Sequence, residues 1–177
     1  MGVLGLLAAA VILLGAGMGG VSDDARAEAP VPPSVKRAIV DRFPHVTRFY
    51  FPRSLPAGYR YAHWERVELE RAAGKPYIGV YTIYFAPPGS TWIEAYRANE
   101  SWGRWRQLRP LAPCGALYGG RAARLVGGRR TFYLRRRNDQ TAAFCVRGYA
   151  VELTLNHHPL RPLALSRLVA RAVVVGR

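Results

Sequence analysis

The sequence is poor in lysine, in acidic residues and in cysteine, and the shortage of cysteine excludes one class of protein. Among its 177 residues 26 are basic, but only Lys36 and Lys75 are lysines, and only 11 residues are acidic. Two cysteines, Cys114 and Cys145, exclude a disulfide-rich scaffold and allow one bridge. Half of the residues are hydrophobic and 21% are charged, which is a globular composition and not a disordered one. We therefore expect one folded domain with a formal net charge of +15.

The sequence also lacks the patterns that accompany catalysis or metal binding. No serine lies in a nucleophile-elbow pattern, and Glu65, Glu68 and Glu70 form no recognisable acid–base pair. His157 and His158 are adjacent, so on an extended chain they point apart, and no cysteine or carboxylate completes a ligand set. We expect no catalytic residues, no cofactor and no metal, and a hydrolase with unrecognised residues is the least favoured alternative.

The first 27 residues have the pattern of an export signal. Residues 3–18 are almost wholly apolar, and Ala25-Arg26-Ala27 places a cleavage site before Glu28. The apolar run has the length of a signal segment and is shorter than the roughly 20 residues of a membrane span. We expect a secreted or extracytoplasmic protein, and the alternative is an uncleaved anchor at residues 3–18. In an exported chain a bridge between Cys114 and Cys145 is favoured over two separate thiols.

After a proline-rich extended lead at residues 28–33, residues 34–177 are expected to form a single α+β domain. One helix is predicted from Ser34 to about Phe43, and a last helix starts at Pro162. Strands are predicted at 47–51, 59–69, 77–85, 91–97, 117–126, 129–137, 142–147 and 149–155, with a long loop or helical turn at 98–113. Consecutive strands with short turns favour an antiparallel arrangement. The predicted fold is a single curved antiparallel sheet of about six to eight strands, with both terminal helices packed on one face.

The positive charge is concentrated in the second half of the chain. Residues 101–177 contain fifteen arginines against two acids, whereas residues 28–100 contain ten basic and seven acidic residues. Alternation along the strands predicts that Phe132, Leu134, Phe144 and Val146 form scaffold, with Cys145 facing the other way. The candidate anion-binding face consists of Arg121, Arg124, Arg129, Arg130, Tyr133, Arg135 and Arg137. The alternative for these residues is a solvated basic face without a ligand.

Two motifs carry a family resemblance. The stretch Phe51-Pro52-Arg53-Ser54-Leu55-Pro56-Ala57-Gly58-Tyr59 resembles the aromatic-Pro-x-x-Leu-Pro-x-Gly-Tyr opening turn of uncharacterised bacterial extracytoplasmic domains, and residues 144–153 are similar to their closing strand pair. The chain departs from the group in lacking the usual tryptophan near Phe144 and the cytoplasmic domain that often precedes. The resemblance implies a domain outside the membrane with no enzymatic activity. A more distant likeness, in architecture alone, is to the curved sheet of periplasmic lipoprotein carriers.

These observations predict an exported, non-enzymatic binding module of the cell envelope. Its partner would be an anionic polymer, a phospholipid surface or another protein, engaged through the basic sheet face. The export signal argues against nucleic acid as the partner. The alternative function is a carrier of a lipid or apolar ligand, or an envelope sensor, in which Trp92, Trp102, Trp105 and the tyrosines of residues 77–84 line a pocket between the sheet and a loop. Such residues more often belong to the core, which is the favoured interpretation for them.

Overall fold

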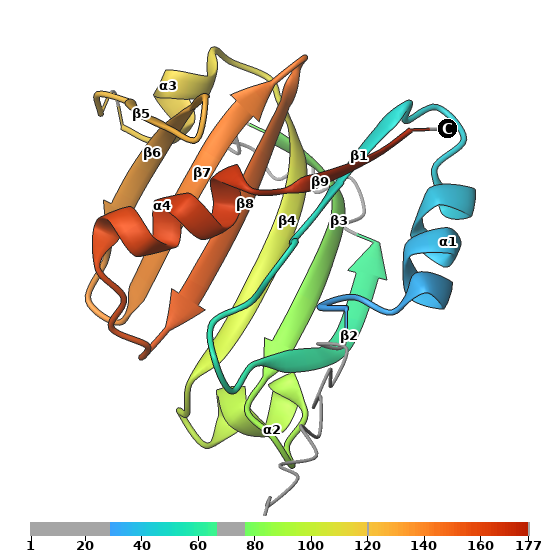
Figure 1. Ribbon diagram of the computed structural model, residues 1–177, viewed down its shortest axis with the longest axis vertical. Helices are drawn as coiled ribbons and strands as arrows, with labels where there is room; N and C mark the ends of the chain where they lie inside the picture. The colour runs from blue at the N-terminus through green and yellow to red at the C-terminus, as the bar shows by residue number, and fades with distance from the viewer. Residues whose placement is uncertain (1–28, 67–76, 120, 177) are drawn as a thin grey trace, which may run out of the picture.

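The computed structural model describes residues 29–66, 77–119 and 121–176, and these form an α+β fold around an open antiparallel sheet (Figure 1). The sheet has seven strands in the order β2-β3-β4-β8-β7-β6-β5, and β1 and β9 form a separate two-stranded sheet. The elements in chain order are α1 (Pro33–Arg42), β1 (Arg48–Phe51), β2 (Arg60–Arg66), β3 (Tyr77–Ala86), α2 (Trp92–Arg97), β4 (Trp102–Pro110), α3 (Cys114–Leu117), β5 (Arg124–Val126), β6 (Arg129–Arg135), β7 (Asp139–Val146), β8 (Tyr149–Asn156), α4 (Pro162–Ala170) and β9 (Val173–Gly176).

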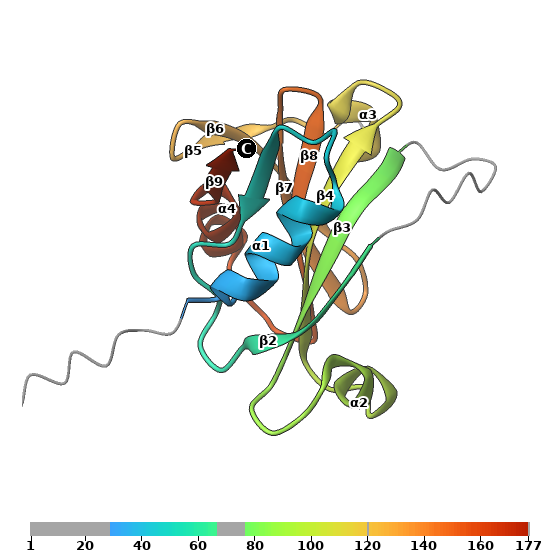
Figure 2. The ribbon, with the colours of Figure 1, turned by 90° about the vertical axis from the view of Figure 1, so that its right-hand side faces the viewer.

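The two faces of the large sheet are covered differently. Seen from the side in Figure 2, α1, α4 and the β1–β9 pair lie on one face, called the front face, and α3 lies on the opposite, back face. The main core lies on the front face, where Ile39 of α1 and Leu165 and Val169 of α4 are fully buried. This arrangement confirms the predicted antiparallel sheet with both terminal helices on one face. The predicted signal or anchor segment and the turn at residues 71–76 lie outside the described residues.

The predicted loop at residues 98–113 is wrong, because these residues include β4, an interior strand of the sheet. This strand pairs with β3 on one side and with β8 on the other, and Trp105 is completely buried. The segment carries prolines and three arginines, which a strand inside a sheet has to accommodate. In the sheet Arg106 lies opposite Glu152, and its Nη2 atom is 2.6 Å from the Oε2 atom of this carboxylate. A cross-strand ion pair thus lets a charged sequence occupy the middle of a sheet.

Two further predicted strands are wrong. The segment 91–97 is the helix α2, because the Thr91 hydroxyl accepts from the amide of Glu94 while the Glu94 carboxylate accepts from the amide of Thr91. This capping box fixes the start of a helix. The segment 117–126 contains the end of α3, a connection and the three-residue strand β5. The structure also adds β9, which the sequence pattern after the last helix did not predict.

The β1–β9 pair is attached to the large sheet by side chains. The amide of Tyr50 donates to Oε1 of Gln107 at 3.1 Å, and Nε2 of Gln107 donates to the carbonyl of Arg48 at 2.9 Å. The Tyr50 carbonyl accepts from the Tyr81 hydroxyl at 2.7 Å and from Trp105 Nε1 at 2.6 Å. Because β9 pairs with only one edge of β1, these side chains take the place of a ladder on its other edge.

The predicted assignment of side chains to the two faces of β6 and β7 is wrong by one position. Tyr133 lies opposite Ala142, so Tyr133 and Phe144 share the front face and pack in the main core. Phe132 lies opposite Ala143, so Phe132 and Cys145 share the back face. A shift of one residue between paired strands exchanges every side chain between the faces, which is why alternation within single strands did not determine the pairing.

The disulfide between Cys114 and Cys145 is present, which confirms that prediction. It joins the start of α3 to β7, and the two Cα atoms are 6.2 Å apart. The surrounding residues form a smaller core on the back face, in which Leu108, Tyr118, Ala143 and Ala150 are buried. Within the described ranges, no helix is long and apolar enough to cross a membrane.

Candidate anion-binding site

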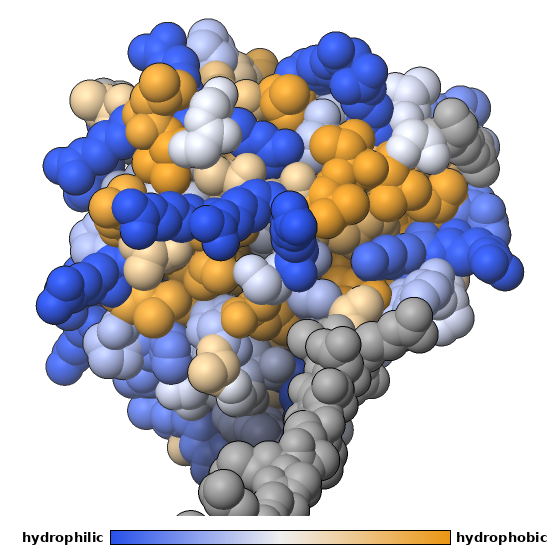
Figure 3. All heavy atoms as spheres, viewed as in Figure 1, coloured by the Kyte–Doolittle hydropathy of each residue, from blue (hydrophilic) through white to orange (hydrophobic). Residues whose placement is uncertain are grey.

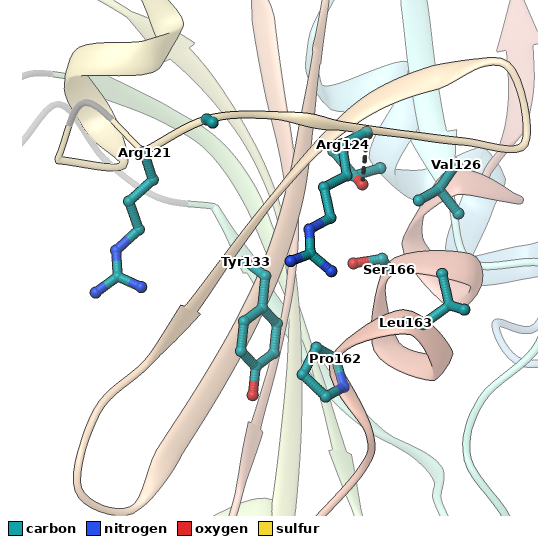
Figure 4. A pocket seen from close by; sticks show the side chains of 9 residues that line it. Arg121, Arg124, Val126, Tyr133, Pro162, Leu163 and Ser166 are labelled. Carbon is teal, nitrogen blue, oxygen red and sulfur yellow. Dashed lines mark hydrogen bonds between the residues drawn. The ribbon is translucent and has the colours of Figure 1, made fainter.

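A pocket of about 350 Å³ lies between the β5–β6 hairpin and the first turns of α4 (Figure 4). Its upper rim carries Arg121 and Arg124, whose guanidinium groups both point down toward the level of Tyr133. The other labelled lining residues are Val126, Pro162, Leu163 and Ser166. We call this cavity the α4 pocket. It brings together three members of the predicted anion-binding face, Arg121, Arg124 and Tyr133.

The β5–β6 hairpin is held in place by a two-residue glycine turn. Gly127 and Gly128 have φ angles of 56° and 76°, a conformation that favours glycine at both positions and matches a tight hairpin. A Cβ atom on Gly127 would lie 3.8 Å from the Cβ atom of Ala170, so the turn sits against the end of α4. The hydroxyl of Thr131 donates to the carbonyl of Arg124 at 3.1 Å. These hydrogen bonds and packing interactions fix the backbone from which Arg124 reaches over the pocket.

The first turn of α4 forms the opposite wall and contributes a positive field. The helix has nine residues and begins at Pro162, and neither a side-chain cap nor an acidic residue occurs in its first turn. The N-terminal end of a helix carries a partial positive charge and favours an anion. Ser166 is only 6% exposed and lines the cavity one turn further along.

Among the described residues, no carboxylate lines the α4 pocket. Arg121 and Arg124 are exposed, and neither guanidinium forms an ion pair or hydrogen bond within the described part of the chain. The Tyr133 hydroxyl donates to Oε1 of Gln140 at 3.3 Å, and Nε2 of Gln140 donates to the carbonyl of His158 at 2.8 Å. These two consecutive hydrogen bonds orient the ring of Tyr133, while the N–H groups of the two guanidinium groups stay available to a ligand.

The other predicted anion-binding residues lie elsewhere, so the seven do not form one face. Arg129 reaches toward the core, where its guanidinium lies 4.3 Å from the centre of the Phe144 ring and donates to the carbonyl of Ala172 at 3.3 Å. Burial lowers the pKa of Arg129 from its usual value. Arg130 lines a depression beside the disulfide on the back face. Arg135 and Arg137 line a third cavity, at the β6–β7 turn.

Sequence reasoning missed the contribution of α4 to the site. Pro162, Leu163 and Ser166 line the pocket but were not candidates. The available signal was a proline at a helix start with no acid in the following turn, next to a strongly basic segment. The packing of α4 against the β5–β6 hairpin joins segments that are distant in the chain, and no local sequence pattern predicts it.

The back face carries a buried polar cluster that sequence reasoning also missed. Glu152 is 6% exposed, and besides its ion pair with Arg106 it accepts from the Tyr118 hydroxyl at 3.0 Å. Arg104 lies nearby, and burial followed by the charge of Arg106 lowers the pKa of its guanidinium. The carboxylate is engaged on both oxygens, which suits a structural role in the sheet.

The proposed apolar pocket residues mostly belong to the core. Trp105 is completely buried and Trp102 is 8% exposed, while Trp92 stacks on Tyr84 with ring centres 4.0 Å apart. Across the described ranges, no group of three or more His, Cys, Asp or Glu side chains is placed to hold a metal ion. On the front face as a whole, hydrophilic side chains lie among exposed hydrophobic ones (Figure 3).

Comparison with known proteins adds no identity: no family model, no curated protein and no solved structure matches this chain. The resemblance to bacterial extracytoplasmic domains therefore stays a prediction, and the function has to be argued from the site itself.

Proposed function

We propose that this protein is an exported, non-enzymatic binding domain of the cell envelope that holds an anionic group in the α4 pocket. One observation carries the proposal: Arg121 and Arg124, whose guanidinium groups have no partner among the described residues, line a cavity that no described carboxylate lines and whose opposite wall is the uncapped first turn of α4. Arginine and a helix N-terminus both favour phosphate and carboxylate groups, and here they converge on one volume.

The lining of the pocket indicates what accompanies the anionic group. Val126, Pro162 and Leu163 supply apolar surface beside the guanidinium groups. Small-molecule sites have volumes of about 300–1,000 Å³, so a cavity of about 350 Å³ accepts a compact group. A phosphate or carboxylate attached to a short apolar or sugar-like unit fits these properties, and such units are abundant as parts of larger envelope components.

The extracytoplasmic location is supported by the Cys114–Cys145 disulfide. A disulfide is consistent with an oxidising compartment, because cytosolic thiols are kept reduced. The apolar segment at residues 3–18 and the A-x-A pattern before Glu28 point in the same direction.

The test is titration with phenyl phosphate, which combines an anionic and an apolar part, compared with inorganic phosphate. We expect phenyl phosphate to bind more tightly, and Arg124→Ser to weaken it by about tenfold or more, since a charged hydrogen bond contributes about 1.5–3 kcal/mol. The control is Arg60→Ser, which removes the same charge from an exposed position on β2 at the opposite edge of the sheet. Absence of phenyl phosphate binding by the wild-type protein at low salt, or equal weakening by both substitutions, contradicts the proposal.

A further inference from the structure

A second basic depression lies at the β6–β7 turn, beyond the far end of the strand that lines the α4 pocket. It has a volume of about 150 Å³, and its cationic lining comes from Arg135, Arg136 and Arg137, beside His157 and His158. All three arginines are exposed. We call it the turn depression.

The turn depression is built from two segments that hydrogen bonds hold together. The amide of Arg136 donates to the carbonyl of Asp139 at 2.8 Å, which closes the β6–β7 turn. The amide of His157 donates to the carbonyl of Asn138 at 2.9 Å, which ties the β8–α4 connection to that turn. The depression therefore has a defined backbone, although its arginines extend into solvent.

One carboxylate lines the turn depression, and it already has a partner. The Oδ1 atom of Asp139 accepts from Nδ2 of Asn156 at 2.8 Å. Apart from it, the segments 121–138 and 157–176 contain no aspartate or glutamate. Both cavities and the surface between them therefore carry an excess of positive charge.

The two cavities are joined along the front face of β6. Thr131 and Tyr133 line the α4 pocket, and Arg135, on the same face of the strand, lines the turn depression. Thr131 pairs with Arg124 across the hairpin, and the four steps along the strand from Thr131 to Arg135 span about 13 Å at the usual strand rise. The hydrogen bond from Tyr133 to Gln140 crosses the boundary, because Gln140 lines the turn depression.

We propose that the ligand is a linear polyanion, a chain of repeated phosphate or carboxylate groups that occupies the α4 pocket and the turn depression together. This inference rests on the proposed function, because the α4 pocket is one of its two sites. A single small anion fills one cavity and leaves the arginines of the other with no counter-charge from the ligand. Among the described residues that line the turn depression Pro159 is the one apolar residue, so an inserted lipid chain would find little apolar surface there, and a hydrophilic polymer is favoured over a bilayer surface.

The experiment compares three soluble probes, namely phenyl phosphate, tripolyphosphate and long-chain polyphosphate. Tripolyphosphate is shorter than the separation of about 13 Å along β6, so only the long chain reaches both cavities. We expect long-chain polyphosphate to bind most tightly. Arg135→Ser/Arg137→Ser is expected to weaken this binding about tenfold or more while leaving phenyl phosphate binding unchanged.

The salt dependence of binding provides a second readout. The logarithm of the binding constant K decreases with the logarithm of the salt concentration. For flexible polyanions this decrease becomes less steep by about 0.7 for each phosphate that a cationic side chain no longer neutralises, so the double substitution should lower the magnitude of the slope by about 1.4. The matched control, Arg53→Ser/Arg60→Ser, removes two exposed arginines that line neither cavity. Its polyphosphate binding should stay close to that of the wild type, and circular dichroism should show that all variants are folded.

The outcomes separate this inference from the proposed function. If the wild type binds phenyl phosphate but Arg135→Ser/Arg137→Ser binds long-chain polyphosphate as the wild type does, the polyanion inference is wrong and the α4 pocket stands. If the wild type fails to bind phenyl phosphate, the proposed function is wrong. The last probe is vesicles of phosphatidylglycerol and phosphatidylcholine. If the protein binds these vesicles more tightly than polyphosphate, and if this binding does not depend on Arg135 and Arg137, the ligand is a membrane surface and the polyanion inference is wrong.

Discussion

Replacing Gln107 with leucine tests how the β1–β9 pair is attached to the large sheet. Gln107 is completely buried, accepts from the amide of Tyr50 and donates to the carbonyl of Arg48. Leucine has a similar volume but no hydrogen-bonding atoms, so the substitution leaves two backbone groups of β1 without a partner. Each orphaned buried group costs about 1–3 kcal/mol, which amounts to a decrease of about 2–6 kcal/mol in the free energy of unfolding.

The matched control is Tyr81→Phe. The Tyr50 carbonyl accepts from both Tyr81 and Trp105, so removal of the Tyr81 hydroxyl leaves it a partner. The expected decrease is that of one net hydrogen bond, about 0.5–1.5 kcal/mol. The contrast between the variants isolates the cost of unpaired backbone from the cost of removing one bond.

Denaturant unfolding followed by tryptophan fluorescence measures both decreases. For a domain of this size, each kcal/mol lowers the thermal midpoint by about 2–4 °C, so Gln107→Leu should lower it by about 4–24 °C. Hydrogen exchange adds a local readout, because the Tyr50 amide should lose its protection in Gln107→Leu and keep it in Tyr81→Phe. The reasoning is refuted if Gln107→Leu costs no more than Tyr81→Phe.

Two further predictions concern the disulfide and a buried tyrosine. Reduction of the Cys114–Cys145 bridge, which closes a loop of 31 residues, should lower the free energy of unfolding by about 3–4 kcal/mol on the loop-entropy model, and equal denaturant midpoints with and without reductant would contradict this. Burial, and then the hydrogen bond that its hydroxyl donates to Glu65 at 2.6 Å, raise the pKa of Tyr84 from 10.0 to about 12. The folded state therefore holds this proton more tightly than the unfolded state, and the stabilisation is complete below pH 10 and is lost as the pH rises toward 12. An ultraviolet absorbance titration should show the Tyr84 transition at lower pH in Glu65→Gln, and an unchanged transition would contradict the role of Glu65.

The elements that could be predicted from the sequence are those with a strong local pattern. Residues 77–85 are β-prone and apolar on both faces, and they form the interior strand β3. Pro162 marks the start of α4, and the turn before Tyr149 separates β7 from β8 as expected. The cysteine pair was predictable because an exported chain with two cysteines favours one bridge.

The elements that could not be predicted depend on partners distant in the chain. The arginines of β4 could be assigned to the interior of the sheet only once Glu152, 46 residues away, was placed opposite Arg106. The segment 91–97 contained a readable signal in Thr91 and Glu94, but its apolar residues suggested a strand. The faces of β6 and β7 depend on the pairing of Tyr133 with Ala142, which alternation within one strand does not contain.

The same limit applies to the candidate site. Arginine richness marked the right region of the chain, and three of the seven predicted residues line the α4 pocket. The sequence could not show that Arg129 turns inward onto Phe144, because a cation next to an aromatic ring is a product of packing. The sequence also could not show that the first turn of α4 lies beneath Arg124.

The pairing of β1 with β9 sets the order in which the protein can mature. Residues 48–51 find their strand partner only in residues 173–176, and the same ribbon covers the core beside Tyr81 and Trp105. A chain emerging from the ribosome therefore lacks one wall of its core until residue 176 has been made. Pairing between such distant segments slows folding, since the intervening chain must be closed into a loop first. Under the export proposed above, this topology favours folding after translocation, because a chain that waits for its last strand stays in the extended form that a translocation channel accepts.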